Sequence, residues 1–213
     1  MRLVGLWAFV MAAPFLAAQA DDDGRIFGVI PNNKTAQAAV VAAPLTAGDK
    51  FHLAFRDTVD PFTFVLAGFN AGVSQWGNGA PAFGQGGSGY AKRFGAAYAD
   101  QAIGNYLAEA ILPSLLKQDP RYFRMGTGGK WRRTKYALTR VVVTRTDAGK
   151  AVFNYSEIGG NAAAAAISTI YYPATERTAG EAGERYGVQI GSDAAFSVLL
   201  EFWPDMKRAL FRK

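Results

Sequence analysis

The residues best equipped for chemistry in this sequence are arginines near the ends of predicted helices. In the string 119–124, Asp-Pro-Arg-Tyr-Phe-Arg, two arginines stand three residues apart beside aromatic side chains. Guanidinium groups at such a spacing can clamp an anion through charge-assisted hydrogen bonds. Similar charges recur further along the chain. We therefore predict an anion-binding set made of Arg121, Arg124, Arg145 and Arg185.

Carboxylates on the same predicted helices are the expected partners of these arginines. We predict that Glu109, Glu157 and Asp193 orient them. A buried ionised group costs several kcal/mol unless it is paired, so arginines in a mostly neutral bundle need partners or ligands. The alternative is an internal arginine–carboxylate network that only joins helices. Spacing along the chain leaves both interpretations open, because it does not place Arg121 beside Arg185.

The scarcity of other reactive side chains narrows the chemistry. The sequence has no cysteine and a single histidine, His52. Disulfide frameworks, thiolate metal sites and cysteine nucleophiles are excluded. A catalytic His52 would need Asp49 or Asp57 as its partner, and a structural histidine on a helix flank is the simpler interpretation. We predict no metal site, no cofactor and no catalytic residue, which favours a non-enzymatic protein.

The glycine-rich segment 84–89 fits the pattern G-x-G-x-x-G. A dinucleotide site needs a preceding strand and a βαβ unit, which the sequence does not indicate. Tyr90 stands where a phosphate-binding loop would continue with lysine. The segment therefore predicts a loop that leads into a helix.

The first twenty residues have the layout of a cleavable signal peptide. Arg2 precedes an apolar run over 3–18, and Ala18-Gln19-Ala20 is a small-x-small cleavage site. The alternative is an uncleaved anchor, although the run is shorter than the ~20 residues of a membrane span. We predict export to the periplasm or envelope of a Gram-negative bacterium. The expected organisation is a signal peptide over 1–20, an irregular segment over 21–45 and one helical domain over 46–213.

Composition and charge predict a folded protein that binds an anionic surface. Hydrophobic residues make up 50% of the chain, which excludes an intrinsically disordered protein, and the net charge is +6. The basic residues gather in 117–145 and 207–213. For an exported protein we expect an anionic lipid or membrane surface as partner, and no nucleic acid. The alternative is a solvated basic face. The sequence does not set the oligomeric state.

Capping signatures and prolines predict an all-α fold, a compact bundle of about six helices after a cleaved signal peptide. Thr46 with Asp49, Asn154 with Glu157 and Thr178 with Glu181 resemble capping boxes, and Asp60-Pro61 resembles an N-cap followed by proline. Pro113 is expected to kink or end the third helix. The predicted helices cover a segment around 51–55 and then 61–76, 88–117, 130–143, 155–172 and 178–203. A hairpin over 141–154 is the alternative to the end of the fourth helix.

Polar side chains form stripes along four of these helices, and the stripes on the second, third and fifth helices are mostly neutral amides and hydroxyls. Residues four or seven apart share a face of a helix. Either the stripes face water, or they point inward while apolar residues face lipid. The stripes are Thr63, Asn70 and Ser74; Gln101, Asn105 and Glu109; Glu157, Asn161 and Ser168; and Arg185, Gln189, Asp193, Ser197 and Glu201.

Strings along most of the predicted domain resemble an uncharacterised family of secreted proteins from acidobacteria and similar Gram-negative bacteria. They include Phe83-Gly84-Gln85-Gly86, the segment 119–124, Thr144-Arg145-Thr146-Asp147 and Glu201-Phe202-Trp203-Pro204-Asp205. This resemblance implies no activity.

The segment 185–193 also resembles the third motif of the type 2 phosphatidic acid phosphatase superfamily, a helical membrane fold. The segment 154–161 occupies the place of that family's second motif. Gln189 stands where the nucleophilic histidine belongs, and glutamine cannot form the phosphoenzyme. This resemblance implies lost phosphatase chemistry and a retained lipid- or phosphate-shaped cavity. The sequence thus favours a membrane-associated structural or binding protein. The alternatives are a divergent lipid-phosphate enzyme and a small soluble periplasmic interaction module.

Overall fold

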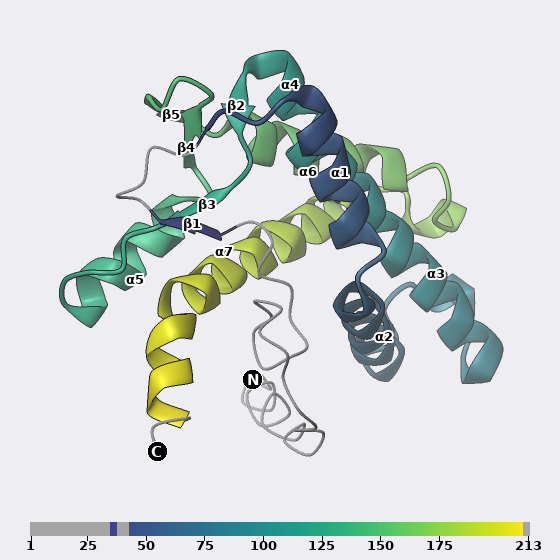
Figure 1. Cartoon of the computed structure of the whole chain (residues 1–213). Coiled ribbons are helices and arrows are strands. Elements are labelled where there is room, and N and C mark those ends of the chain that lie inside the picture. Colours follow the sequence, from purple (N-terminus) through teal and green to yellow (C-terminus); the bar gives the residue numbers. More distant parts are fainter. Residues whose placement is uncertain (1–34, 38–42, 211–213) are drawn as a thin grey trace.

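The computed structural model describes residues 35–37 and 43–210 (Figure 1). The predicted signal peptide and most of the segment 21–45 lie outside these residues. Helices dominate, as predicted. The helices are α1 (Ala47–Thr58), α2 (Pro61–Trp76), α3 (Gly86–Asn105), α4 (Leu112–Leu116), α5 (Lys130–Thr139), α6 (Tyr155–Ser168) and α7 (Ala179–Leu210), with short 3₁₀ turns at Pro81–Phe83 and Ala174–Glu176.

The predicted caps begin these helices. Thr46 and Asp49 form a complete capping box at α1, in which the Asp49 backbone amide donates to Thr46 Oγ1 over 3.2 Å. Asp60 accepts a hydrogen bond from the Phe62 amide at the start of α2, with Pro61 in the first position. Asn154 caps α6 in the same way by accepting from the Glu157 amide. Side-chain oxygens thus satisfy backbone donors that a helix leaves free.

The third helix continues through the region where Pro113 was expected to disturb it. After α3 the backbone forms one π-helical segment, η2 (Tyr106–Ile111), and then resumes as α4 with Pro113 near its start. The helix ends when Lys117 enters the left-handed region, at φ 53°. A π-helical turn rotates the side chains that follow it, and such turns are frequent at functional sites.

The last helix is longer than predicted. The sequence predicts an end at Trp203, but α7 continues through Pro204 to Leu210. Proline removes one backbone hydrogen bond and bends a helix without necessarily ending it. Figure 1 shows the final yellow part of α7 turning away from the axis of the rest.

Two small sheets join the helices. Strands β2 (Gln118–Asp119), β4 (Val143–Thr146) and β5 (Ala151–Phe153) form an antiparallel sheet in the order β2-β4-β5. The hairpin alternative over 141–154 is therefore correct, and it replaces the end of the predicted fourth helix. A second pair, β1 (Thr35–Gln37) with β3 (Tyr122–Arg124), is parallel.

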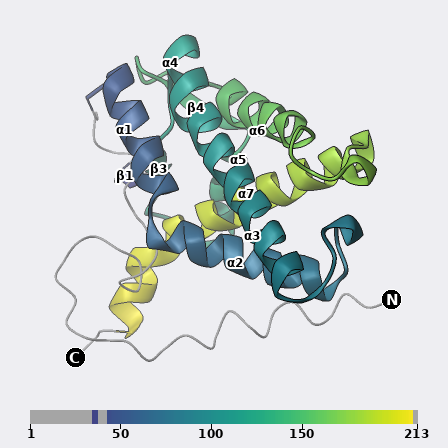
Figure 2. The ribbon, with the colours of Figure 1, turned by 90° about the vertical axis from the view of Figure 1, so that its right-hand side faces the viewer.

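Close helix packing brings the elements of the central region together. α6 packs against α3, η2 and α7 (Figure 2). At Gly160 an added Cβ would lie only 2.8 Å from the Cα and N atoms of Ala108, so the backbones of α6 and η2 touch. A separate apolar cluster of Tyr122, Ala137, Leu200 and Trp203 joins β3, α5 and α7.

The polar stripes lie mostly on the inner faces of the helices. Asn105, Glu109, Asn161, Ser168 and Glu201 are all buried. Apolar side chains are exposed in return. One group lies on α1 and α2: Phe51, Phe55 and Val59 on or next to α1, and Phe64, Val65, Phe69, Val73 and Trp76 on α2. Among the described residues, no helix combines the length and the apolar character that a bilayer crossing needs.

Candidate binding site

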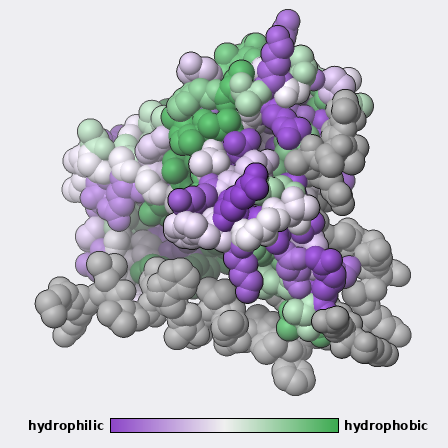
Figure 3. Space-filling view, turned by 90° about the vertical axis from the view of Figure 1, so that its left-hand side faces the viewer, coloured by the Kyte–Doolittle hydropathy of each residue, from purple (hydrophilic) through white to green (hydrophobic). Residues whose placement is uncertain are grey.

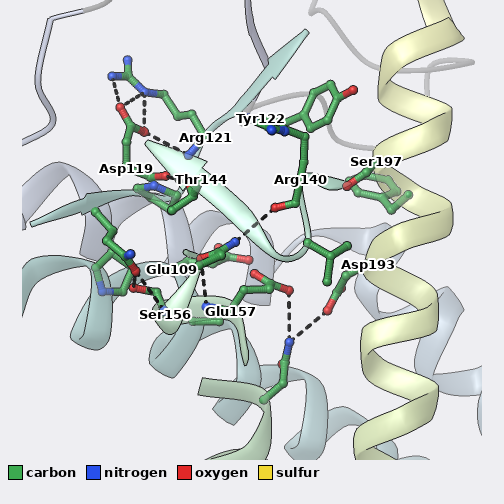
Figure 4. Close-up of a pocket in the computed structure, with 18 of the residues that line it drawn as sticks. Glu109, Asp119, Arg121, Tyr122, Arg140, Thr144, Ser156, Glu157, Asp193 and Ser197 are labelled. Carbon is green, nitrogen blue, oxygen red and sulfur yellow. Dashed lines mark hydrogen bonds and ion pairs between the residues drawn. The ribbon is translucent and has the colours of Figure 1, made fainter. Parts of the chain in front are cut away.

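A cavity of about 100 Å³ lies where the polar stripes of three helices meet the strands (Figure 4). We call it the first cavity. Side chains from η2, α6 and α7 form one side, and residues of β2, β3 and β4 with the end of α5 form the other. Its polar lining includes Asn105, Glu109, Gln118, Asp119, Arg121, Arg140, Thr144, Arg145, Asn154, Ser156, Glu157, Asn161, Gln189, Asp193 and Ser197.

All three predicted carboxylates line this cavity. Glu109 comes from η2, Glu157 from α6 and Asp193 from α7. The Asn161 side-chain amide links two of them, because it donates to Glu157 Oε1 over 3.0 Å and to Asp193 Oδ2 over 3.1 Å (Figure 4). Gln189 makes a longer hydrogen bond of 3.4 Å to Asp193 Oδ1. Neutral amides thus hold two of the carboxylates in place.

The local backbone explains why Glu109 reaches the cavity. Glu109 lies within the π-helical segment, and its side chain is only 6% exposed. Gly160 lets α6 approach this segment closely, and a Cβ added at Gly104 would lie 3.4 Å from Asn161 Oδ1. Small residues at these two crossings therefore bring Glu109, Glu157 and Asn161 to one place.

Two arginines on the opposite side have no carboxylate partner among the described residues. The Arg145 guanidinium lies 4.3 Å from the centre of the Phe123 ring, and that of Arg140 lies 4.5 Å from the Tyr136 ring. Arg140 Nε is shielded from solvent and donates no hydrogen bond within the described structure. An aromatic face stabilises a cation but accepts no strong hydrogen bonds. The described residues thus leave hydrogen-bonding capacity on two arginines that line the cavity.

Arg121 lies at the same cavity but is already neutralised. Its Nε donates to Asp119 Oδ1 over 2.9 Å and its Nη2 to Asp119 Oδ2 over 2.6 Å. These hydrogen bonds raise the pKa of Arg121 above its ordinary value. Nη2 also donates to the Ala43 carbonyl. Arg121 therefore fixes the β2–β3 connection at the edge of the cavity.

The other two predicted arginines lie elsewhere, so the four do not form one cluster. Arg124 donates to the Glu201 carbonyl and lies 3.8 Å from Asp205, in a network between β3 and α7. Arg185 donates to Ser168 Oγ and stacks on Tyr172. Sequence spacing could not separate these positions, because each arginine belongs to a different element.

Sequence reasoning missed Arg140 as a site residue and also missed Gln118. Arg140 lies in the basic segment 117–145 of the sequence, and in the structure it follows α5 directly and lines the cavity next to the hairpin. Gln118 accepts from both Ser156 N and Ser156 Oγ and donates to the Phe153 carbonyl. The asparagine and glutamine stripes were the available signal for the cavity, since they mark the inward faces.

The remaining motifs have structural explanations. The loop at 84–89 needs its glycines because Gly84 and Gly86 have positive φ and a Cβ on Gly89 would lie 2.3 Å from the Gly84 carbonyl oxygen. No strand precedes the loop directly, as predicted.

His52 is exposed on α1. Within residues 35–37 and 43–210, no group of three or more histidine, cysteine or acidic side chains has a geometry that could hold a metal ion.

Comparison of the chain with protein-family models, curated proteins and solved structures finds no match. The resemblances described above therefore stay predictions, and the site has to be interpreted from its own geometry.

Proposed function

We propose that this protein is a membrane-associated binding protein of the bacterial envelope that holds an anionic, phosphate-like group in the first cavity. The observation that carries the proposal is the pair Arg140 and Arg145. Both line the cavity, and neither has a carboxylate partner among the described residues. A phosphate would give both guanidinium groups charge-assisted hydrogen bonds.

The size and polarity of the cavity fit a headgroup better than a whole lipid. Its volume of about 100 Å³ is below the ~300–1,000 Å³ of pockets that enclose drug-sized molecules. Among the lining carboxylates, Asp119 is neutralised by Arg121, and Asn161 hydrogen-bonds Glu157 and Asp193 on the side of the cavity opposite the two arginines. They offer acceptors for the donor groups of a ligand.

The outer surface of α5 supports a role at an anionic membrane. Lys130, Arg132 and Lys135 are exposed there, and Trp131 between them is 69% exposed. Figure 3 shows the side of the molecule that carries α5 and the hairpin, with hydrophilic side chains close to a green hydrophobic area. Tryptophan beside cations is typical of membrane-surface contacts. We call this surface the α5 face.

A calorimetric titration with inorganic phosphate tests the cavity. We expect Arg145→Gln and Arg140→Gln each to weaken phosphate binding by about 10–100-fold, the effect of one charge-assisted hydrogen-bond pair. Arg132→Gln is the matched control, because it removes an exposed arginine outside the cavity. Equal affinity in all three variants would contradict the proposal.

Vesicle sedimentation tests the α5 face separately. The protein should bind vesicles that contain phosphatidic acid or phosphatidylglycerol and should dissociate as salt rises. Arg132→Gln combined with Lys135→Gln should weaken vesicle binding and leave phosphate affinity unchanged. Binding that is equal on neutral and anionic vesicles would exclude an electrostatic membrane contact.

A lipid-phosphate enzyme is the second candidate. Its support is that both segments resembling the phosphatase motifs line the first cavity, through Glu157, Asn161, Gln189 and Asp193. Release of phosphate from phosphatidic acid or a pyrophosphate lipid would distinguish the two candidates. If the wild type releases phosphate and Glu157→Gln or Asp193→Asn does not, the protein is an enzyme and the binding role is wrong.

A further inference from the structure

A second cavity, of about 430 Å³, lies beside the first and has no role in the proposal above. Residues of α2, α3, α6 and the first half of α7 line it, together with Phe83 and Tyr172. Its volume falls within the range of pockets that enclose small organic ligands.

Two side chains lie between the two cavities. Asn161 and Gln189 line both of them, and both donate hydrogen bonds to Asp193. Asn161 is buried and held by two hydrogen bonds, whereas Gln189 is half-buried and holds Asp193 only over 3.4 Å. Moving the Gln189 side chain aside would therefore break only this long hydrogen bond and would join the two cavities.

The polar lining of the second cavity matches hydroxyl groups. Its neutral members are Asn70, Ser74, Gln101, Asn161 and Gln189. Amide side chains both donate and accept hydrogen bonds, as hydroxyls do, whereas an ammonium group only donates. A hydroxyl-bearing ligand thus satisfies donors and acceptors alike.

Three of the five charged side chains around this cavity, Arg93, Asp100 and Arg185, form hydrogen bonds within the protein, and the other two, Glu181 and Glu184, offer carboxylate acceptors to hydroxyl groups. Asp100 accepts hydrogen bonds from both Tyr171 and Tyr172, and burial raises the pKa of this carboxyl. Arg93 donates to the carbonyls of Gly79, Ala80 and Gly84. The cavity therefore offers amides, hydroxyls, two carboxylates and the rings of Phe83 and Tyr172 to a ligand.

We propose that the ligand is a phosphate ester of a polyol or sugar, with its phosphate in the first cavity and its hydroxyl-bearing part in the second. This inference rests on the proposed function, because it assigns the second cavity to the rest of the same molecule.

Calorimetry with three soluble probes tests it: inorganic phosphate, ethyl phosphate and glucose 1-phosphate. Glucose 1-phosphate should bind about tenfold more tightly than ethyl phosphate, which corresponds to one or two additional net hydrogen bonds. Ala97→Leu narrows only the second cavity and should remove this advantage while it leaves the affinity for ethyl phosphate within about twofold. Ala91→Leu, at an exposed position of α3, should behave like the wild type.

Asn70→Leu gives an independent variant in case Ala97→Leu fails to fold, and it should also reduce the preference for glucose 1-phosphate. Equal binding of the two esters by the wild type would overturn the inference and leave the proposed function intact. Equal loss of both esters in Ala97→Leu and Asn70→Leu would overturn it as well. Absence of binding for all three probes would overturn the proposed function, and this inference with it.

Discussion

Two regions of this molecule use arginines and carboxylates in opposite ways. Between β3, α5 and α7, Glu201 is completely buried and accepts hydrogen bonds from Arg133 Nε, Tyr122 Oη and the Met125 and Gly126 amides. Arg133 also pairs with Asp205. We call this set the Glu201 network. Every charge in it has a partner within the protein.

At the first cavity, by contrast, Arg140 and Arg145 stack on aromatic rings without a carboxylate partner among the described residues. Two of the carboxylates across the cavity, Glu157 and Asp193, accept hydrogen bonds from neutral amides. The Glu201 network therefore agrees with the interpretation of the sequence as an arginine–carboxylate network that joins helices. The first cavity agrees with the other interpretation, in which arginines bind a ligand. The comparison predicts that substitutions in the network reduce stability and that substitutions in the cavity reduce binding.

The largest effect is expected from Glu201→Ala. Removing one partner of a buried ion pair leaves the other charge uncompensated, which costs about 3–5 kcal/mol. Urea unfolding should show this loss in the free energy of unfolding. Glu184→Ala, an exposed position on the same helix, is the control and should stay within about 0.5 kcal/mol of the wild type. A loss below 1 kcal/mol for Glu201→Ala would remove the distinction between the regions.

Gly160→Ala should destabilise the protein by about 1–3 kcal/mol, because the added Cβ overlaps the backbone of Ala108. The neighbouring Gly159→Ala is the matched control. Its Cβ would meet only Leu112 Cδ1 at 3.7 Å, so this change should be neutral or stabilising. Thermal unfolding measures both. Two variants of equal stability would show that the close crossing of α6 and η2 is not required.

Acid should weaken the Glu201 network. Burial opposes ionisation of Glu201, but hydrogen bonds from Arg133, Gly126 and Tyr122 outweigh it and hold the pKa of this carboxyl below its ordinary value. Its contribution to stability is therefore complete above about pH 4.3, the ordinary pKa of glutamate, and is lost as pH falls through the lowered pKa. Urea unfolding at several pH values should give a shallower acid dependence for Glu201→Gln. An unchanged slope would contradict this assignment.

The smallest effect on stability is expected from Arg145→Gln. This variant loses the cation–π contact with Phe123 but no carboxylate partner, so it should unfold within about 1 kcal/mol of the wild type. Arg133→Gln, in the Glu201 network, should lose several times as much because it leaves Glu201 buried without its cation. A large loss for Arg145→Gln would place Arg145 in a structural network instead.

Local signals in the sequence predicted much of the fold. The caps at Thr46, Asp60 and Asn154 are visible because they depend on residues two or three positions apart. The course of α7 through Pro204 was not predictable in this way, since packing against the rest of the protein decides whether proline ends a helix or bends it. The parallel pairing of β1 with β3 was missed too, because it joins residues far apart in the chain.

The candidate site was predictable only in part. The stripes identified Glu109, Glu157 and Asp193, since helical spacing shows which residues share a face. They did not show which arginines would meet them. Arg140 reaches the cavity through the hairpin after α5, while Arg124 turns to Glu201 although it lies only three residues from Arg121.

The most direct test of the account compares the unfolding free energy of the wild type with that of the Arg140→Gln, Arg145→Gln double variant, each with and without phosphate. A ligand at one hundred times its dissociation constant stabilises the folded state by about 2.7 kcal/mol. We predict that the double variant is as stable as the wild type without phosphate, and that only the wild type gains stability when phosphate is added. A double variant that unfolds several kcal/mol more easily without phosphate, or that gains as much as the wild type with it, would contradict the central claim.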